Sequence, residues 1–288
     1  MEPSRDPGAR LRGVPRRPGL PTFLSGASPS FVGVVHLLPT PGSPRSAGSL
    51  APVLARAVED ARALVAGGCD ALLVENFGDA PFHPRSVPPE TVAALALAVD
   101  AVRSASGGRP VGVNVLRNDA RAAIGICAAT GASFVRVNVH AGAAASDQGI
   151  LEGRAHETLR ERARLAPGVA ILADAHVKHA TPLGRETLGE AVRELVQRAL
   201  ADAVIVSGRE TGSPPTVADL REAREAAGGA PVLVGSGLTA ENAGDLLPLV
   251  DGAIVGTSIE REGRTAEPVD PARVARLRAA FDRLRAKS

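Results

Sequence analysis

The sequence predicts an α/β fold, a single closed (β/α)8 barrel of the phosphate-binding type. After residue 28, short apolar β-branched runs alternate eight times with longer amphipathic stretches, as in a parallel sheet with helical connections. The length of 288 residues lies in the range where such a barrel forms one domain. The turns after the last two apolar runs combine Gly with Ser or Thr. A doubly wound open sheet is the alternative, because a strand count from one sequence can err by one or two.

The expected strands are short apolar runs of the length typical of buried parallel strands. They span Phe31–His36, Ala71–Glu75, Pro110–Val115, Phe134–Val139, Val169–His176, Ala203–Ser207, Pro231–Gly235 and Gly252–Gly256.

The expected helices lie between these runs, and several begin at a capping residue or an early Pro, such as Asp119 or Asp270-Pro271. They span Pro52–Ala66, Pro89–Ser104, Ala120–Thr130, Gly153–Leu165, Glu186–Leu200, Thr216–Ala226, Ala240–Leu247 and Pro271–Ala286. Long segments follow the first, second, fourth and fifth strands. In a barrel these βα loops form the face where chemistry takes place.

Composition narrows the function. Hydrophobic residues make up 44% and charged residues 22%, which is typical of a globular protein. With no Trp, no Tyr and six Phe, the chain lacks stacking platforms for nucleic acid, so no nucleic-acid partner is expected. Cys69 and Cys127 lie in apolar surroundings and are interpreted as small buried hydrophobes.

Residues 1–28 carry five Arg against Glu2 and Asp6 and are predicted to be a disordered basic tail, with the barrel over residues 29–288. No apolar run approaches the ~20 residues of a membrane helix. We therefore expect no transmembrane segment and a cytoplasmic location, with contact to a membrane surface left open.

Polar side chains share one face of several expected strands, because side chains alternate between the two faces of a strand. Arg136, Asn138 and His140 share a face in the fourth strand, and Asp174, His176 and Lys178 in the fifth. Asn114 and His36 repeat the pattern in the third and first. A buried Arg136 requires a carboxylate, and the strands offer Asp174 and Glu75. The sequence predicts a network with one or both, structural or functional in role.

The polar residues at this end of the strands give five candidate catalytic groups, Asp174, His176, Glu75, Lys178 and His36, and three candidate substrate contacts, Asn114, Arg136 and Asn138. Asp174 and His176 are expected side by side, as a general acid/base pair or as two ligands of a divalent metal that His36 or Glu75 completes. Lys178 is the one Lys in the barrel body. Its amine suits either a Schiff base with a carbonyl substrate or the binding of an anionic substrate.

The turns after the seventh and eighth strands predict a phosphate site, because Gly leaves backbone amides accessible. The candidate residues are Gly235, Ser236, Gly237, Gly256, Thr257 and Ser258, and the loop containing Ser207 and Gly208 is expected to close the same corner.

The stretches GVVHLLPTPGSPR, ALLVENFGDAPF, PVGVNVLRND, SDQGILEGRAHE, ILADAHVKHA, DAVIVSGRETGSPP and VLVGSGLTAEN resemble, in order, the BtpA family. The likeness covers about Phe31 to Ser258. It implies a TIM barrel and a family named for a factor needed for photosystem I accumulation, without an established reaction. Within the loop that follows the fourth strand, Asp147, Gln148 and Glu152 match the family pattern and are candidate substrate contacts.

The leading hypothesis is an isomerase, epimerase or lyase acting on a small phosphorylated metabolite. No nicotinamide or flavin cofactor is expected, because no dinucleotide fingerprint lies between a first strand and its helix. The rival hypothesis is an assembly factor that works through the basic tail and the Arg-rich last helix. A homo-oligomer remains open in either case.

Overall fold

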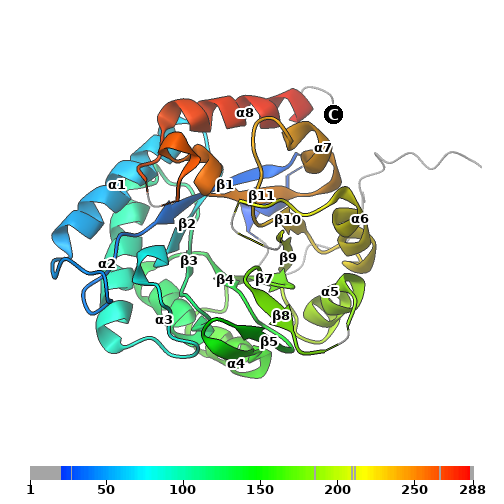
Figure 1. Cartoon of the computed structure of the whole chain (residues 1–288), viewed down its shortest axis with the longest axis horizontal. Coiled ribbons are helices and arrows are strands. Elements are labelled where there is room, and N and C mark those ends of the chain that lie inside the picture. The colour runs from blue at the N-terminus through cyan, green and yellow to red at the C-terminus, as the bar shows by residue number, and fades with distance from the viewer. Residues whose placement is uncertain are drawn as a thin grey trace, which may run out of the picture.

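A computed structural model describes residues 21–285, except for the single positions 27, 185, 209, 211 and 266. Its centre is a closed barrel of eight parallel strands in the order β1-β11-β10-β9-β7-β4-β3-β2, which confirms the predicted architecture and excludes the open sheet (Figure 1). The barrel strands are β1 (Ser30–His36), β2 (Ala71–Glu75), β3 (Val111–Asn114), β4 (Phe134–Val137), β7 (Ala170–Ala175), β9 (Ala203–Val206), β10 (Val232–Val234) and β11 (Gly252–Val255).

Eight α-helices surround these strands within the described part of the chain (Figure 1). They are α1 (Ala51–Ala66), α2 (Pro89–Ala105), α3 (Ala120–Thr130), α4 (Ala155–Leu165), α5 (Leu188–Gln197), α6 (Val217–Ala226), α7 (Ala243–Leu246) and α8 (Pro271–Arg285). Asp119 caps α3 as predicted, since its side chain accepts a hydrogen bond from the Ala122 amide. None of these helices is long and apolar enough to cross a membrane.

Two apolar cores stabilise the barrel. The larger one lies between the strands and the helices and contains both Cys69 and Cys127. Burial raises the pKa of each thiol to about 12, which agrees with their interpretation as buried hydrophobes. The smaller core fills the barrel interior with side chains such as Val32, Leu73 and Phe134.

The amino-terminal end of the barrel is closed by residues that composition assigns to the tail. Thr22–Leu24 form a single 3-10 turn, η1. Leu24 belongs to the interior core, and the Phe23 ring lies 5.2 Å from that of Phe134. The folded unit therefore begins before the predicted boundary at residue 29, and residues 1–20 of the predicted tail lie outside the described residues.

The opposite end, the barrel mouth, carries a small antiparallel sheet that the sequence did not predict. Its strands are β5 (Ala143–Ser146), β6 (Gly149–Glu152) and β8 (Ala180–Pro182), in the order β6-β5-β8. It joins the loops that follow β4 and β7. Four further 3-10 turns, η2 (Phe77–Asp79), η3 (Leu247–Leu249), η4 (Thr257–Ile259) and η5 (Arg261–Gly263), lie in other connections.

Candidate active site at the barrel mouth

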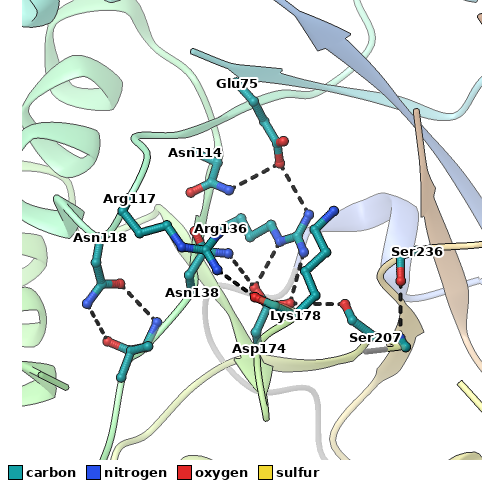
Figure 2. A network of polar contacts seen from close by, with 12 residues as sticks. Glu75, Asn114, Arg117, Asn118, Arg136, Asn138, Asp174, Lys178, Ser207 and Ser236 are labelled. Atoms are coloured by element: carbon teal, nitrogen blue, oxygen red, sulfur yellow. Dashed lines mark hydrogen bonds and ion pairs between the residues drawn. The ribbon is translucent and has the colours of Figure 1, made fainter. Parts of the chain in front are cut away.

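A buried ion-pair network lies at the centre of the barrel mouth, as the sequence predicts (Figure 2). Arg136 of β4 donates from Nε and Nη2 to the two carboxylate oxygens of Asp174 on β7, each at 2.9 Å. Its Nη1 lies 3.2 Å from Oε1 of Glu75 at the end of β2. Both predicted carboxylates therefore bind Arg136. Burial opposes the charge of the guanidinium, but these carboxylates raise its pKa above the ordinary value.

Asp174 is saturated by its neighbours. Besides the two bonds from Arg136, it accepts hydrogen bonds from Asn138 Nδ2 at 2.9 Å and from Ser207 Oγ at 3.4 Å. Its side chain is 0% exposed, and it lines neither of the two cavities at the mouth. The geometry therefore does not favour the predicted proton transfer by Asp174. It fixes the orientation of Arg136 instead.

Glu75 is the carboxylate that reaches the cavities. Its Oε1 accepts a hydrogen bond from Asn114 Nδ2 at 3.1 Å as well as from Arg136. Burial acts to raise the pKa of Glu75, but Arg136, His36 and Lys178 outweigh it and hold the pKa below the ordinary value. Glu75 is therefore an ionised carboxylate at neutral pH and presents an acceptor to both cavities.

Lys178 lies beyond the end of β7, with its side chain beside the Arg136 guanidinium (Figure 2). It lines both cavities. Burial lowers the pKa of its amine, and the positive charges of Arg136 and Arg117 lower it further, against the opposite effect of Glu75 and Asp174. A lowered pKa brings the amine closer to the neutral, nucleophilic form.

His36 forms a second polar contact at the mouth. The sequence predicts His36 as a site residue but does not predict its partner Glu260. Its Nδ1 lies 2.6 Å from Oε1 of Glu260, a buried residue in the loop after β11, and its Nε2 lies 3.7 Å from Oε2 of Glu75. An imidazole held by one carboxylate and facing another can be fixed in one tautomer and orientation. Nothing in the pattern around Glu260 marked it, because it follows the strand by several residues.

The predicted phosphate residues meet at one cavity. Cavity 1, of about 280 Å³, is lined by all six, Gly235, Ser236, Gly237, Gly256, Thr257 and Ser258, and also by His36, Glu75, Arg136 and Lys178. Arg273 of α8 adds a cation at its rim. The Ser236 and Ser258 hydroxyls donate to the carbonyls of Ser213 and Leu238, so they fix the loops.

Glycine is required at two points of this wall of cavity 1. Gly237 has a φ of 71°, and a Cβ on Gly256 would lie 2.4 Å from His36 Cε1.

Ser207 and Gly208 occupy the expected corner. The Gly208 amide donates to Ser236 Oγ at 3.1 Å, which ties the loop after β9 to the loop after β10. Neither residue lines cavity 1. Thr211 of the same loop lies outside the described residues.

Cavity 2 is larger, about 460 Å³, and lies across the same central residues. Glu75, Arg136 and Lys178 line both cavities, so the two meet at the network. Four predicted contacts, Asn114, Asn138, Asp147 and Gln148, line cavity 2 together with Phe77, Ala80, Phe82, Leu116, Arg117 and His179. The β5–β6 hairpin places Asp147 and Gln148 there.

Three polar residues that the sequence analysis singled out line neither cavity. His176 has a φ of 54°, which ends the strand alternation, and its Nε2 lies 3.8 Å from Glu186 Oε1 rather than beside Asp174. Glu152 is 47% exposed and pairs with Arg85 and Arg154. His140 packs against Ala199, whose carbonyl lies 3.0 Å from its Nε2, because β4 ends at Val137.

The metal alternative depends on Asp174 and His176 as a pair, whereas the His176 ring lies near Glu186. Among the described residues, no group of three or more His, Cys, Asp or Glu could hold a metal ion. The sequence also missed functional candidates, namely Glu260, Arg117, Arg273, Phe77 and Phe82. Of these, Glu260 lies in a loop and Arg273 in α8, so strand alternation gives no direction for either side chain.

A closed (β/α)8 barrel with polar side chains gathered at the carboxyl ends of its strands defines this protein as a TIM barrel. Residues 28–283 match the BtpA family, and the chain belongs to that family.

Relatives agree with this family assignment, and solved structures agree with the fold. The chain is 51% identical over 243 residues to the Photosystem I biogenesis protein BtpA of Synechocystis sp., covering 84% of each chain. It is 46% identical over 247 residues to an uncharacterized protein of Thermococcus kodakarensis, covering 86% of this chain and 93% of the relative.

Among solved structures, phosphoribosyl anthranilate isomerase from Thermus thermophilus superposes with a TM-score of 0.55 at 13% identity, covering 90% of this chain and 100% of that one. A native KDPGal structure superposes with a TM-score of 0.53 at 16% identity, covering 89% of this chain and 94% of that one. At these identities the likeness concerns the fold.

Proposed function

We propose that this protein is an enzyme that acts on a small phosphorylated metabolite by proton transfer, as an isomerase, epimerase or lyase. One observation carries the proposal. Cavity 1 joins the six residues of the two glycine turns to Glu75, His36 and Lys178 in one continuous wall. A phosphate held at the turns would place the rest of a small substrate against the ionisable groups.

The roles follow from the environment of each group. Glu75, ionised and facing both cavities, is the candidate base for a proton next to a carbonyl. Lys178, with its lowered pKa, either polarises that carbonyl or forms a Schiff base with it. Glu260 positions His36, and Asp174 positions Arg136.

A substitution of Arg273 can test the phosphate site, because the same helix offers a matched control residue. It lines cavity 1 and is 42% exposed, so its removal should not disturb the core. Arg276 lies one turn further along α8, pairs with Glu241 at 2.5 Å and lines neither cavity. The two substitutions Arg273→Gln and Arg276→Gln change the same charge on the same helix.

The experiment is thermal unfolding of the purified protein with inorganic phosphate, a panel of sugar phosphates and the matching unphosphorylated sugars. A ligand at about 100 times its Kd adds ~2.7 kcal/mol to the free energy of unfolding, a rise of several degrees in Tm for a chain of this size. We expect selective stabilisation by a sugar phosphate that Arg273→Gln weakens and Arg276→Gln preserves. A panel without any shift in the wild type would overturn the proposal.

A second function is favoured by the 51% identical relative, whose name assigns it to photosystem I biogenesis. An assembly factor would contact partners through its outer surface, where the Arg residues of α8 lie. Three of these already have partners within the chain, since Arg273 lies near Asp270, Arg276 pairs with Glu241 and Arg278 with Asp70. A flat ligand panel would favour this function over the enzymatic one.

A further inference from the structure

Two buried polar atoms without a hydrogen-bond partner in the described part of the chain belong to residues that line cavity 2. They are Nε of Arg117 and Oδ1 of Asn138. The two residues are only 5% and 2% exposed, and both line the cavity. Buried polar groups in folded proteins are nearly always hydrogen-bonded, so an unpaired donor and an unpaired acceptor in two residues that line one cavity are available to a polar ligand there.

Each of these two side chains also donates one hydrogen bond within the chain, which restricts its direction. Arg117 donates from Nη2 to the Lys178 carbonyl at 2.6 Å, and Asn138 donates from Nδ2 to Asp174 at 2.9 Å. The ligand must therefore present an acceptor to Arg117 and a donor to Asn138. An amide or lactam edge offers both an acceptor and a donor.

Aromatic rings form another part of the wall. The chain has six Phe and no Tyr or Trp. Phe31, Phe134 and Phe281 are fully buried in the cores, whereas Phe77 and Phe82 are partly exposed and line cavity 2. Their ring centroids lie 6.5 Å apart in an edge-on arrangement. Ring faces at a cavity favour a planar ligand group.

The loop that carries Phe77 is held in place before any ligand binds. Asp79, at the end of η2, accepts hydrogen bonds from the Thr40 amide at 2.7 Å and from Asn76 Nδ2 at 3.0 Å. Oδ1 of Asn76 accepts in turn from the Leu116 amide at 2.7 Å. The loops after β1, β2 and β3 are thereby connected, and this wall of cavity 2 is preorganised.

We propose that cavity 2 binds a planar heterocycle with an amide-like edge, of the nucleobase class. Because Glu75, Arg136 and Lys178 line both cavities, one ligand can span them, with its phosphate in cavity 1 and its heterocycle in cavity 2. The substrate is then a phosphorylated sugar that carries a nucleobase-like ring. The spanning part of this inference rests on the proposed function, whereas the ring site in cavity 2 stands on its own contacts.

The test is isothermal titration of the full chain with ribose 5-phosphate, with adenosine, guanosine and uridine, and with the three nucleoside 5′-monophosphates. We expect at least one monophosphate to bind more tightly than both its nucleoside and ribose 5-phosphate. Phe82→Leu should weaken binding of that nucleoside and its monophosphate about tenfold, the order of one lost stacking contact, and leave ribose 5-phosphate within about twofold. Phe23→Leu is the matched control, because Phe23 lies at the opposite end of the barrel against Phe134.

The outcomes separate the two proposals. If ribose 5-phosphate binds while no nucleoside binds and no monophosphate exceeds it, the heterocycle site is overturned and the proposed function stands. If nucleosides bind in a Phe82-dependent manner but no phosphorylated compound gains affinity, the phosphate site fails and the ring site stands. If Phe82→Leu and Phe23→Leu weaken nucleoside binding equally, the ring does not bind in cavity 2 and the inference is overturned. Far-ultraviolet circular dichroism of both variants verifies the fold.

Discussion

At the scale of single residues, the buried positive charge of Arg136 in the barrel interior is compensated by carboxylates. Arg136 is bound by Asp174 through two hydrogen bonds and by Glu75 through one. Only Glu75 of these two carboxylates lines the cavities. The network therefore divides its carboxylates between a structural partner and a candidate catalytic group, a division that the sequence pattern alone left open.

Asp174→Asn should destabilise the fold rather than act only on chemistry. The substitution removes one charge of a fully buried pair and turns a saturated acceptor into a partial donor that faces Arg136 and Asn138. We expect a loss of about 3–5 kcal/mol in the free energy of unfolding, measured by urea titration. Asp147→Asn, at the exposed hairpin turn of cavity 2, should change it by less than about 0.5 kcal/mol. Equal stability of the Asp174→Asn variant and the wild type would contradict the structural role.

His140 should make stability depend on pH. Burial lowers its pKa from 6.5 to about 4, so the folded protein keeps the ring neutral where the unfolded chain protonates it. This stabilising contribution is complete above pH ~6.5 and is lost as the pH falls toward 4, at a total cost of about 3 kcal/mol. His140→Gln should flatten the stability profile between pH 6.5 and 4.5, although it loses the bond to Ala199 and is less stable at pH 8. His156→Gln, at a largely exposed ring, is the control. An unchanged slope in the His140→Gln variant would show that other groups cause it.

Strand alternation explains which site residues the sequence could predict. Asn114, Arg136 and Asp174 lie inside regular strands, where the side-chain direction follows from the position. The same rule failed for His140 and His176, because each lies past the point where its strand ends. Arg117 and Glu260 lie in irregular loops, and the direction of a loop side chain depends on tertiary contacts that no local pattern contains.

At the scale of elements, the eight strands and eight helices agree with expectation to within a few residues, because hydrophobic periodicity and caps define them locally. The three-stranded sheet at the mouth was missed. Its strands are three or four residues long and rich in Ala and Gly, with sequences AAAS, GILE and ATP. Such segments have low β-propensity, and their pairing depends on the fold that brings the loops after β4 and β7 together.

At the scale of the whole molecule, the two ends of the barrel differ in structure. The mouth is polar and hollow, while the opposite end is closed by Leu24 and Phe23 of η1. Composition assigned these two residues to a tail, because the surrounding Pro, Gly and Ser resemble the basic segment before them. Their function as an apolar plug follows only from the closure of the barrel above them.

The plug predicts a difference between two truncated chains. A chain that begins at Pro29 loses Leu24 from the interior core, and large-to-small changes at such positions cost about 2–5 kcal/mol. For a domain of this size, each kcal/mol lowers Tm by about 2–4 °C. We expect differential scanning calorimetry to show a Tm lower by about 5 °C or more than that of a chain that begins at Pro21, which keeps the plug and is the matched control. The ligand-binding residues lie at the opposite end, so both chains should bind a stabilising ligand with the same Kd. Equal Tm values would return residues 21–28 to the tail, and a loss of ligand binding in the shorter chain alone would show that closure of one end shapes the site at the other.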